Sequence, residues 1–258
     1  MKIVENRFEK YTDATTFSKL VIDYTVPKFL DKIHENYASN IAVGALDKKV
    51  TFEELDKDIK KTCTVLKNNN ISVKSNVGVI CGNNYDFVKT SLGVMAYGAC
   101  ATLLPFQLDD QTIFGCCMKY QLTCVFYESV LKDKLQFAIS HATHVKFIEI
   151  TEFDCVESSF NYDIQESDPA CIVLTGGTTG KSKGAILSHK ALMCGTLNGT
   201  FGVEEVFNQV YYSIMPLTHV FGLIRNLLTS LYTGSTIYFS QDKRTMFKEI
   251  KEVKPTIL

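Results

Sequence analysis

The chain has 258 residues, a formal net charge of −1, nine cysteines and no tryptophan. This length can bury a sizeable core and can hold one large domain or two smaller ones. Lysine and glutamate are interspersed, which argues against nucleic-acid binding, because such proteins usually carry a basic face. No apolar run approaches transmembrane length, and residues 1–10 have mixed charges without the apolar segment of a secretory signal.

The placement of the cysteines argues against disulfides and against a zinc site. Cys81, Cys100, Cys124 and Cys171 lie inside apolar runs, where cysteine behaves as a small buried hydrophobic residue. The total is odd, and the chain contains neither a C-x-x-C pair nor the clustered ligands of a zinc site. We therefore expect reduced thiols and a cytoplasmic protein.

Apolar periodicity in the first two thirds of the chain predicts alternating helices and strands. In order, the predicted elements are a helix begun by Pro27, a strand at 41–46, a helix at 52–66 that begins with a capping box of Thr51 and Glu54, a strand at 77–81, a helix capped by Asn83-Asn84 and ended by Gly98, a strand at 99–104, a helix near 109–119, a strand at 122–127, a helix at 129–140 and a strand at 145–150. Strands and helices with short joints indicate a mostly parallel sheet. Residues 151–168 are acidic and irregular, and we expect them to form a surface connection.

Residues 174–184, with the sequence LTGGTTGKSKG, are the most distinctive segment. They follow an apolar run at 170–174 that is typical of a buried strand, and Ser188 can cap a helix after them. Glycines let backbone N–H groups converge on an anion, while threonine hydroxyls and lysines add donors and positive charge. The order strand, glycine-rich loop, helix therefore predicts phosphate binding at the carboxyl edge of the sheet. The P-loop motif does not fit, because Thr175 stands where it requires glycine.

The last part of the chain continues the alternation. In order, we expect a strand at 211–215, a turn with the pattern P-x-x-H-x-x-G at 216–222, a helix at about 220–232, a strand at 235–239, a helix whose apolar stripe is Met246, Phe247, Ile250 and Val253, a stop at Pro255, and the start of a buried strand at 256–258. A strand of three residues with nothing after it predicts that the natural protein continues beyond Leu258.

The segment Thr175–Gly184 resembles the phosphate loop of the adenylate-forming superfamily, which includes acyl-CoA synthetases, luciferases and the adenylation domains of peptide synthetases. It matches nine of ten positions of that loop, with Ser182 in place of the usual proline. Residues 51–55 (TFEEL), the strand-to-helix segment that ends at Asn84, and the histidine frame at 216–222 resemble further family segments in the same order. The resemblance covers most of residues 40–258.

The resemblance implies the fold and its divisions. We expect an α/β protein with two interleaved α/β lobes, in which mostly parallel sheets are flanked by helices, as in the N-terminal part of the adenylate-forming fold. The predicted divisions are an N-terminal segment at 1–25, one lobe at 71–202 that carries the phosphate loop, and an incomplete second lobe formed by 26–70 plus 203–258. An incomplete sheet would leave an exposed edge, through which we expect the chain to self-associate.

The same resemblance implies an AMP-forming acid–thiol ligase. Such an enzyme activates a carboxylic acid with ATP and Mg²⁺ through an acyl-adenylate and then transfers the acyl group to coenzyme A. The resemblance assigns nucleotide contacts to Thr175, Gly176, Gly177, Thr178, Thr179, Gly180 and Lys183, with Thr179 also facing Mg²⁺. It gives Lys183 the role of following the departing pyrophosphate, and it places His219 near the carboxylate and the α-phosphate.

Two alternatives remain open, and the carboxylate is not identified. The acid can be a fatty or aryl acid, or an amino acid if the chain is part of an amino-acid-activating adenylation domain. The chain can also be a non-catalytic nucleotide-binding module that keeps the loop without the chemistry. The family's later Tyr-Gly-x-Thr-Glu segment and its C-terminal lysine have no counterpart in these residues, so we expect the chain alone to be inactive or nearly so.

Overall fold

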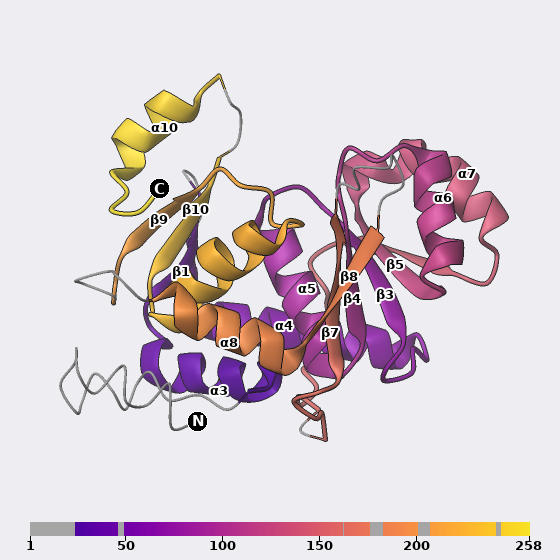
Figure 1. Cartoon of the computed structure of the whole chain (residues 1–258), viewed down its shortest axis with the longest axis horizontal. Helices are drawn as coiled ribbons and strands as arrows, with labels where there is room; N and C mark the ends of the chain where they lie inside the picture. Colours follow the sequence, from indigo (N-terminus) through magenta and orange to yellow (C-terminus); the bar gives the residue numbers. More distant parts are fainter. Residues whose placement is uncertain (1–23, 46–48, 162, 176–182, 201–206, 241–243) are drawn as a thin grey trace.

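The structure, a computed structural model, contains two β-sheets with helices between and around them (Figure 1). It describes residues 24–45, 49–161, 163–175, 183–200, 207–240 and 244–258. One sheet has four strands in the order β2-β1-β10-β9, and the other has six in the order β6-β5-β3-β4-β7-β8. Neighbouring strands are parallel except for the pairs β1–β2 and β7–β8. This arrangement confirms the predicted α/β class with mostly parallel sheets.

The predicted strands fall at or near their expected positions, and the structure adds two short ones, β2 and β8. Their bounds are Ile41–Gly44 for β1, Lys49–Thr51 for β2, Asn76–Ile80 for β3, Cys100–Leu104 for β4, Leu122–Glu128 for β5, Lys146–Ile150 for β6, Pro169–Thr175 for β7, Lys183–Ser188 for β8, Val210–Ser213 for β9 and Thr236–Phe239 for β10. Of the two strands that were not predicted, β2 extends the four-stranded sheet beside β1, and β8 lies directly after the phosphate loop. It pairs along β7 from Thr175 and Lys183 to Pro169 and Ser188.

The helices cover both sheets and fill the space between them (Figure 1). Their bounds are Val26–Tyr37 for α3, Phe52–Asn68 for α4, Tyr85–Tyr97 for α5, Asp110–Lys119 for α6, Ser129–Leu135 for the 3₁₀ segment η1, Gln136–His141 for α7, His189–Gly199 for α8, Gly222–Leu228 for the π-helical segment η2, Thr229–Tyr232 for α9 and Met246–Val253 for α10. Every residue from 87 to 96 of α5 is buried. Among the described helices, none is long and apolar enough to cross a membrane.

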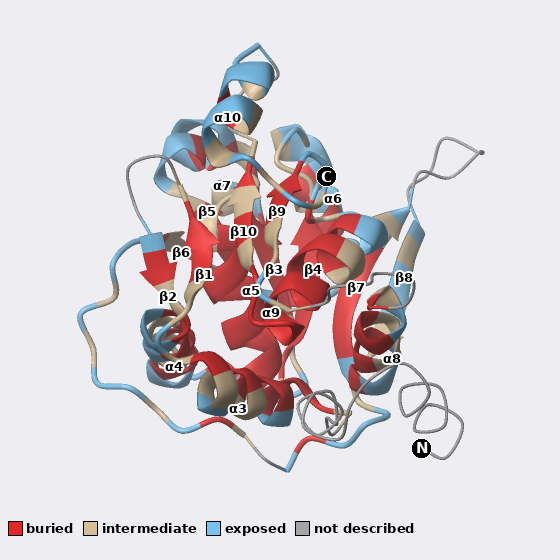
Figure 2. Cartoon of the chain, turned by 90° about the vertical axis from the view of Figure 1, so that its left-hand side faces the viewer, coloured by how far each residue is buried: buried red, intermediate tan, exposed pale blue. Residues whose placement is uncertain are grey.

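One continuous hydrophobic core joins the two sheets. It contains Val43 and Ile237 from the four-stranded sheet, Val79 and Leu103 from the six-stranded sheet, and the buried face of α5. Figure 2 shows these buried elements at the centre, with α10 largely exposed at one end. A second, smaller cluster lies under α6 and α7 on the outer face of the six-stranded sheet. The division of the chain into two lobes stays a prediction.

The structure confirms helix caps that were predicted from residues close together in the sequence. The Thr51 hydroxyl accepts a hydrogen bond from Glu54 N (3.2 Å), and Glu54 Oε2 accepts one from Thr51 N (2.8 Å), which completes the capping box. Ser188 caps α8 by accepting from Ala191 N. Of the predicted Asn-Asn pair, only Asn84 caps α5.

Two predicted α-helices differ because distant or local side chains change their hydrogen bonding. The helix expected at 129–140 is a 3₁₀ segment followed by α7. Helix α7 begins at Gln136 because the Asp110 carboxylate caps it by accepting from Phe137 N (2.6 Å) and Ala138 N (2.8 Å). The helix expected at 220–232 is π-helical up to Leu228, since the Ile224 carbonyl accepts from both the N–H and the hydroxyl of Thr229.

The predicted apolar stripe of α10 is wrong in part. Phe247 is 73% exposed, whereas Glu249 is buried at 4% exposure. The Tyr212 hydroxyl of β9 donates to Glu249 Oε2 at 2.6 Å, so a polar pair holds the helix against the sheet. The described residues of the connection at 151–168 are irregular and mostly exposed, as predicted, although Phe160 and Ile164 are buried.

The residues after α10 return to the four-stranded sheet. Ile257 forms a parallel bridge with Tyr211, and Thr256 N donates to the Val210 carbonyl at 2.9 Å. The expectation of a buried strand at 256–258 is therefore right only for one parallel bridge along β9, and Leu258 is 71% exposed. Self-association through a sheet edge stays a prediction.

Candidate functional site

The carboxyl ends of β3, β4 and β7 lie at one edge of the six-stranded sheet. These strands are parallel neighbours, with Ile80 opposite Leu104 and Leu103 opposite Val173. Adjacent strands are about 4.8 Å apart, so the ends of β3 and β7 are separated by roughly 10 Å. Ligands of open α/β sheets bind at such an edge.

The two described ends of the phosphate loop form the last pair of a β-hairpin at this edge. Thr175 pairs with Lys183, and the Thr175 hydroxyl donates to the Lys183 carbonyl at 3.1 Å. Both residues are exposed. The other predicted contacts, Gly176, Gly177, Thr178, Thr179 and Gly180, lie outside the described residues.

The expected order of strand, loop and helix is wrong. The loop leads into β8, and α8 begins only after Ser188, at the far end of that strand. Five residues of extended chain separate Lys183 from Ser188 by roughly 17 Å. The dipole of α8 is therefore too distant to act on an anion at the loop, and positive charge must come from nearer groups such as Lys183.

The absence of a side chain at Gly184 lets two neighbouring side chains pack against the base of this hairpin. A Cβ atom at Gly184 would lie 2.7 Å from the Ile172 side chain and 2.8 Å from the Tyr120 ring. The Tyr120 ring therefore lies against the backbone directly after Lys183. This contact gives a packing reason for the last glycine of the motif.

His219 lies in an exposed turn after β9. His219 N donates to the Pro216 carbonyl (3.0 Å), and Leu223 N donates to the His219 carbonyl (2.9 Å). His219 Nδ1 accepts from Phe221 N at 3.2 Å, so the neutral imidazole carries its proton on Nε2. The ring can then donate a hydrogen bond from Nε2 to an incoming oxygen.

A side-chain amide connects this turn to the six-stranded sheet. Asn83, three residues after the end of β3, donates from Nδ2 to the Met215 carbonyl (2.9 Å), and its Oδ1 accepts from Leu217 N (2.9 Å). The carboxyl ends of β3 and β9 therefore meet at the predicted site. The sequence analysis treated Asn83 only as a helix cap and missed this contact, although one cap residue suffices for α5.

Apolar side chains surround the turn. Ile214, Met215, Val220 and Phe221 are 38–52% exposed, although all four are large and hydrophobic. Exposed apolar groups that gather next to a polar side chain are typical of a binding surface. The turn therefore combines one hydrogen-bond donor with an apolar surround.

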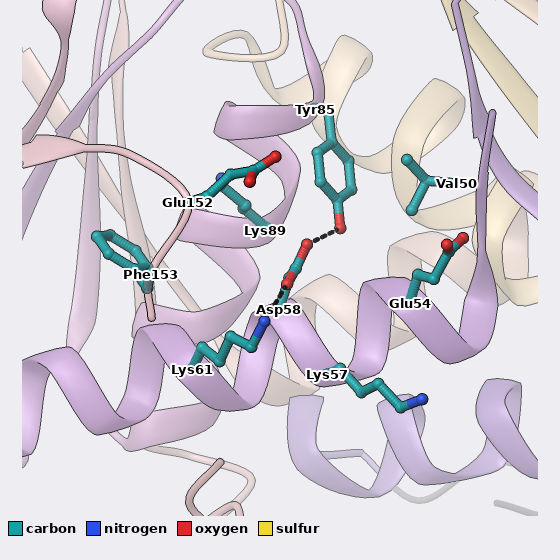
Figure 3. Close-up of a pocket in the computed structure, with 9 residues that line it drawn as sticks. All are labelled: Val50, Glu54, Lys57, Asp58, Lys61, Tyr85, Lys89, Glu152 and Phe153. Carbon is teal, nitrogen blue, oxygen red and sulfur yellow. Dashed lines mark hydrogen bonds and ion pairs between the residues drawn. The ribbon is translucent and has the colours of Figure 1, made fainter. Parts of the chain in front are cut away.

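A separate pocket of about 270 Å³ lies between α4, α5 and the segment after β6 (Figure 3). It is lined by Val50, Glu54, Lys57, Asp58, Lys61, Tyr85, Lys89, Glu152 and Phe153. Its lysines and carboxylates are equal in number, and Asp58 accepts from the Tyr85 hydroxyl at 2.8 Å and pairs with Lys61 at 3.3 Å. Burial and the Asp58 charge raise the pKa of Tyr85. A pocket whose charges balance in this way does not favour an anion such as a phosphate.

Side chains that could bind a metal are scattered over the described part of the chain. Within the residues that the structure describes, no group of three or more histidine, cysteine or acidic side chains could hold a metal ion. All nine cysteines are free, as expected. Burial raises the pKa of most of these thiols, for example that of Cys124 to about 12, so the buried ones are poor nucleophiles.

The family model described as "AMP-binding enzyme" matches residues 30–258. 4-Coumarate–CoA ligase 3 of Arabidopsis thaliana is 24% identical over 213 residues, which cover 76% of this chain and 38% of that ligase. The chain thus spans well under half of the length of that relative. The inhibitor-bound N-terminal domain of FACL13 from Mycobacterium tuberculosis superposes with a TM-score of 0.79 at 18% identity, covering 88% of this chain and 60% of that one. The anthranilate CoA ligase AuaEII in complex with anthranoyl-AMP gives a TM-score of 0.79 at 16% identity, with coverages of 93% and 49%.

Proposed function

The chain belongs to the family of AMP-binding enzymes, and on this premise we propose that it forms part of a ligase that activates a carboxylic acid with ATP and transfers the acyl group to coenzyme A. Several relatives are CoA ligases by name, which supports this reaction class. A solved relative of the same fold is described as a complex with anthranoyl-AMP, an acyl-adenylate.

The observation that carries the proposal is the meeting of two motifs at one edge. The ends of the phosphate-loop hairpin and the His219 turn both lie where β3, β7 and β9 end, and the Asn83 hydrogen bonds join the turn to that edge. A nucleotide bound by the hairpin would therefore have its phosphates close to a histidine donor and an apolar surface.

We assign roles to the residues on this basis. The loop glycines and threonines, including Thr178 and Thr179, would hold the ATP phosphates with backbone N–H and hydroxyl groups, and Lys183 would neutralise the pyrophosphate as it leaves. Mg²⁺ would supply further charge neutralisation, with Thr179 as a candidate ligand. The exposed Lys183 ammonium group fits an anion at the described end of the loop.

His219 would orient the acid. Its Nε2–H can donate to one carboxylate oxygen while the other attacks the α-phosphorus, and the bond to pyrophosphate breaks. No general base is needed because the carboxylate is already an anion. A thiolate of coenzyme A would then displace AMP from the acyl-adenylate.

Hydroxylamine trapping tests the proposal. The protein is incubated with MgATP, hydroxylamine and a panel of fatty, aryl and amino acids, and acyl-hydroxamate is measured for the wild type and Lys183→Ala. We expect a product that depends on ATP and on Lys183, with low turnover because the chain spans 38% of the length of the related ligase. No product from any acid would contradict catalysis by the chain alone. Nucleotide binding that persists without turnover would then favour the non-catalytic module.

The same panel distinguishes the acid class. Pyrophosphate exchange stimulated only by amino acids would identify an amino-acid-activating domain. Exchange stimulated by fatty or aryl acids would support the CoA ligase. We further propose a reducing compartment such as the cytoplasm, because all nine cysteines are free.

A further inference from the structure

The Asn83 side chain holds two backbone groups that lie far away in the sequence. Its Nδ2 donates to the Met215 carbonyl 132 residues away, and its Oδ1 accepts from Leu217 N 134 residues away, both at 2.9 Å. A side-chain amide offers one donor and one acceptor side by side, as a peptide group does in a β-ladder. Asn83 therefore pairs with the turn as one further strand residue would.

Asn83 is itself held firmly on both sides. Glu128, at the end of β5, accepts from Gly82 N (2.8 Å) and from Asn84 Nδ2 (2.6 Å) through the same oxygen, Oε1. The other end of the Asn84 side chain accepts from Phe87 N and caps α5. The residues before and after Asn83 are thus fixed by a carboxylate, a strand end and a helix end.

The turn transmits this restraint to His219 over two residues. Leu217 is fully buried, and the Pro216 carbonyl accepts from His219 N. On the other side, a Cβ atom at Gly222 would lie only 2.2 Å from the Pro216 oxygen, so the following helix is packed directly against the turn. The Asn83 bonds and the Gly222 contact leave His219 little freedom to shift.

We infer that Asn83 is a positioning residue, which holds the His219 turn against the six-stranded sheet so that the imidazole faces the phosphate-loop hairpin. The inference rests on the proposed function, because it takes His219 as a group near the nucleotide. Asparagine is suited to this task because both halves of its amide are used. Alanine would lose both hydrogen bonds, whereas aspartate would keep the acceptor for Leu217 N and lose the donor to Met215.

Nuclear magnetic resonance of the whole chain tests the inference. Mn²⁺ with ATP is the probe, since a bound paramagnetic ion broadens nearby signals even when binding is weak. The proteins compared are the wild type, Asn83→Ala, Asn83→Asp and the matched control Thr236→Val. The Thr236 hydroxyl also donates to the backbone of a distant residue, the Ile41 carbonyl, at 2.8 Å. Thr236 begins β10, so it lies at the end of the four-stranded sheet opposite to the His219 turn.

In the wild type and in Thr236→Val, we expect broadening of the His219 imidazole and of the Lys183 amide. In Asn83→Ala, broadening at His219 falls several-fold while that at Lys183 is kept, and amide exchange of Leu217 becomes roughly fivefold faster, as for the loss of one hydrogen bond. Asn83→Asp gives intermediate values at His219. If the alanine variant does not fold, the aspartate variant tests the positioning role by itself.

Each other outcome is decisive. Equal His219 broadening in the wild type and both Asn83 variants overturns the positioning role, and so does Leu217 exchange that does not change. Wild-type broadening at Lys183 but not at His219 instead overturns the role of His219 in the proposed function. No broadening at either residue overturns the nucleotide site itself, and the positioning role with it.

Discussion

A buried histidine predicts that acid destabilises the fold. His189 is 1% exposed and begins α8, the helix that follows the phosphate-loop hairpin. The ring atom Nδ1 of His189 accepts a hydrogen bond from Val26 N at 3.2 Å. The backbone N–H of His189 donates to the Asp168 carbonyl at 3.1 Å. Burial lowers the pKa of His189 to about 4, and the opposing charge of Asp168 is not sufficient to restore it.

The sign and size of the effect follow from this pKa. The folded protein keeps His189 neutral, whereas the unfolded chain binds a proton once the pH falls below about 6.5. The stabilisation is therefore complete above pH 6.5 and is lost as the pH falls towards 4. A difference of about 2.5 pH units corresponds to about 3 kcal/mol in the free energy of unfolding.

The assay is urea unfolding at pH 7, 6, 5 and 4, followed by circular dichroism because the chain has no tryptophan. His189→Asn keeps an acceptor for Val26 N but cannot be protonated. Between pH 7 and pH 4, we expect the free energy of unfolding of the wild type to fall by about 3 kcal/mol more than that of His189→Asn. The exposed His144, replaced in the same way, is the control. Parallel curves for the wild type and His189→Asn would refute the reasoning.

Three further substitutions test close contacts and a cap. Gly222→Ala would put a Cβ atom 2.2 Å from the Pro216 oxygen and would displace the turn that carries His219. We therefore expect acyl-hydroxamate formation to fall even at temperatures where the variant is fully folded. Unchanged turnover would contradict this. Gly184→Ala should lower the melting temperature through its clash with the Tyr120 ring, and adding Tyr120→Ala should restore part of the loss; strictly additive losses would argue against the clash. Thr51→Ala removes the capping box and should cost about 1 kcal/mol in urea unfolding without changing nucleotide binding, which a shift in ATP affinity would disprove.

Features that depend on neighbouring residues could be predicted from the sequence. The capping box at Thr51, the serine cap before α8 and the left-handed glycine at the end of α5 each involve residues within one helical turn. The alternation of strands and helices was also readable, because the buried parallel strands are continuous apolar runs. These local signals, with the motif spacing, were sufficient for the fold class.

Features that depend on a distant partner could not be predicted in this way. The α-helix α7 begins where it does because Asp110 accepts from Phe137 N, 27 residues later, and the inward face of α10 is set by Tyr212, 37 residues before Glu249. At the site, the motifs indicated Lys183 and His219, but nothing local indicated that Asn83 bonds the turn beside His219. Strand β8 was missed because it is an edge strand with Ile186 exposed, so its pattern does not alternate cleanly.

The pairing of β1 with β10 has a consequence for synthesis of the chain on the ribosome. These strands come from opposite ends of the chain, and the hydrogen bond from Thr236 to Ile41 spans 195 residues. At roughly 5–20 residues per second, β10 emerges about 10 to 40 s after β1. During that interval the β1–β2 hairpin has an open edge and no partner strand. A pause in translation before residue 236 would therefore lengthen the time for which this open edge can pair wrongly.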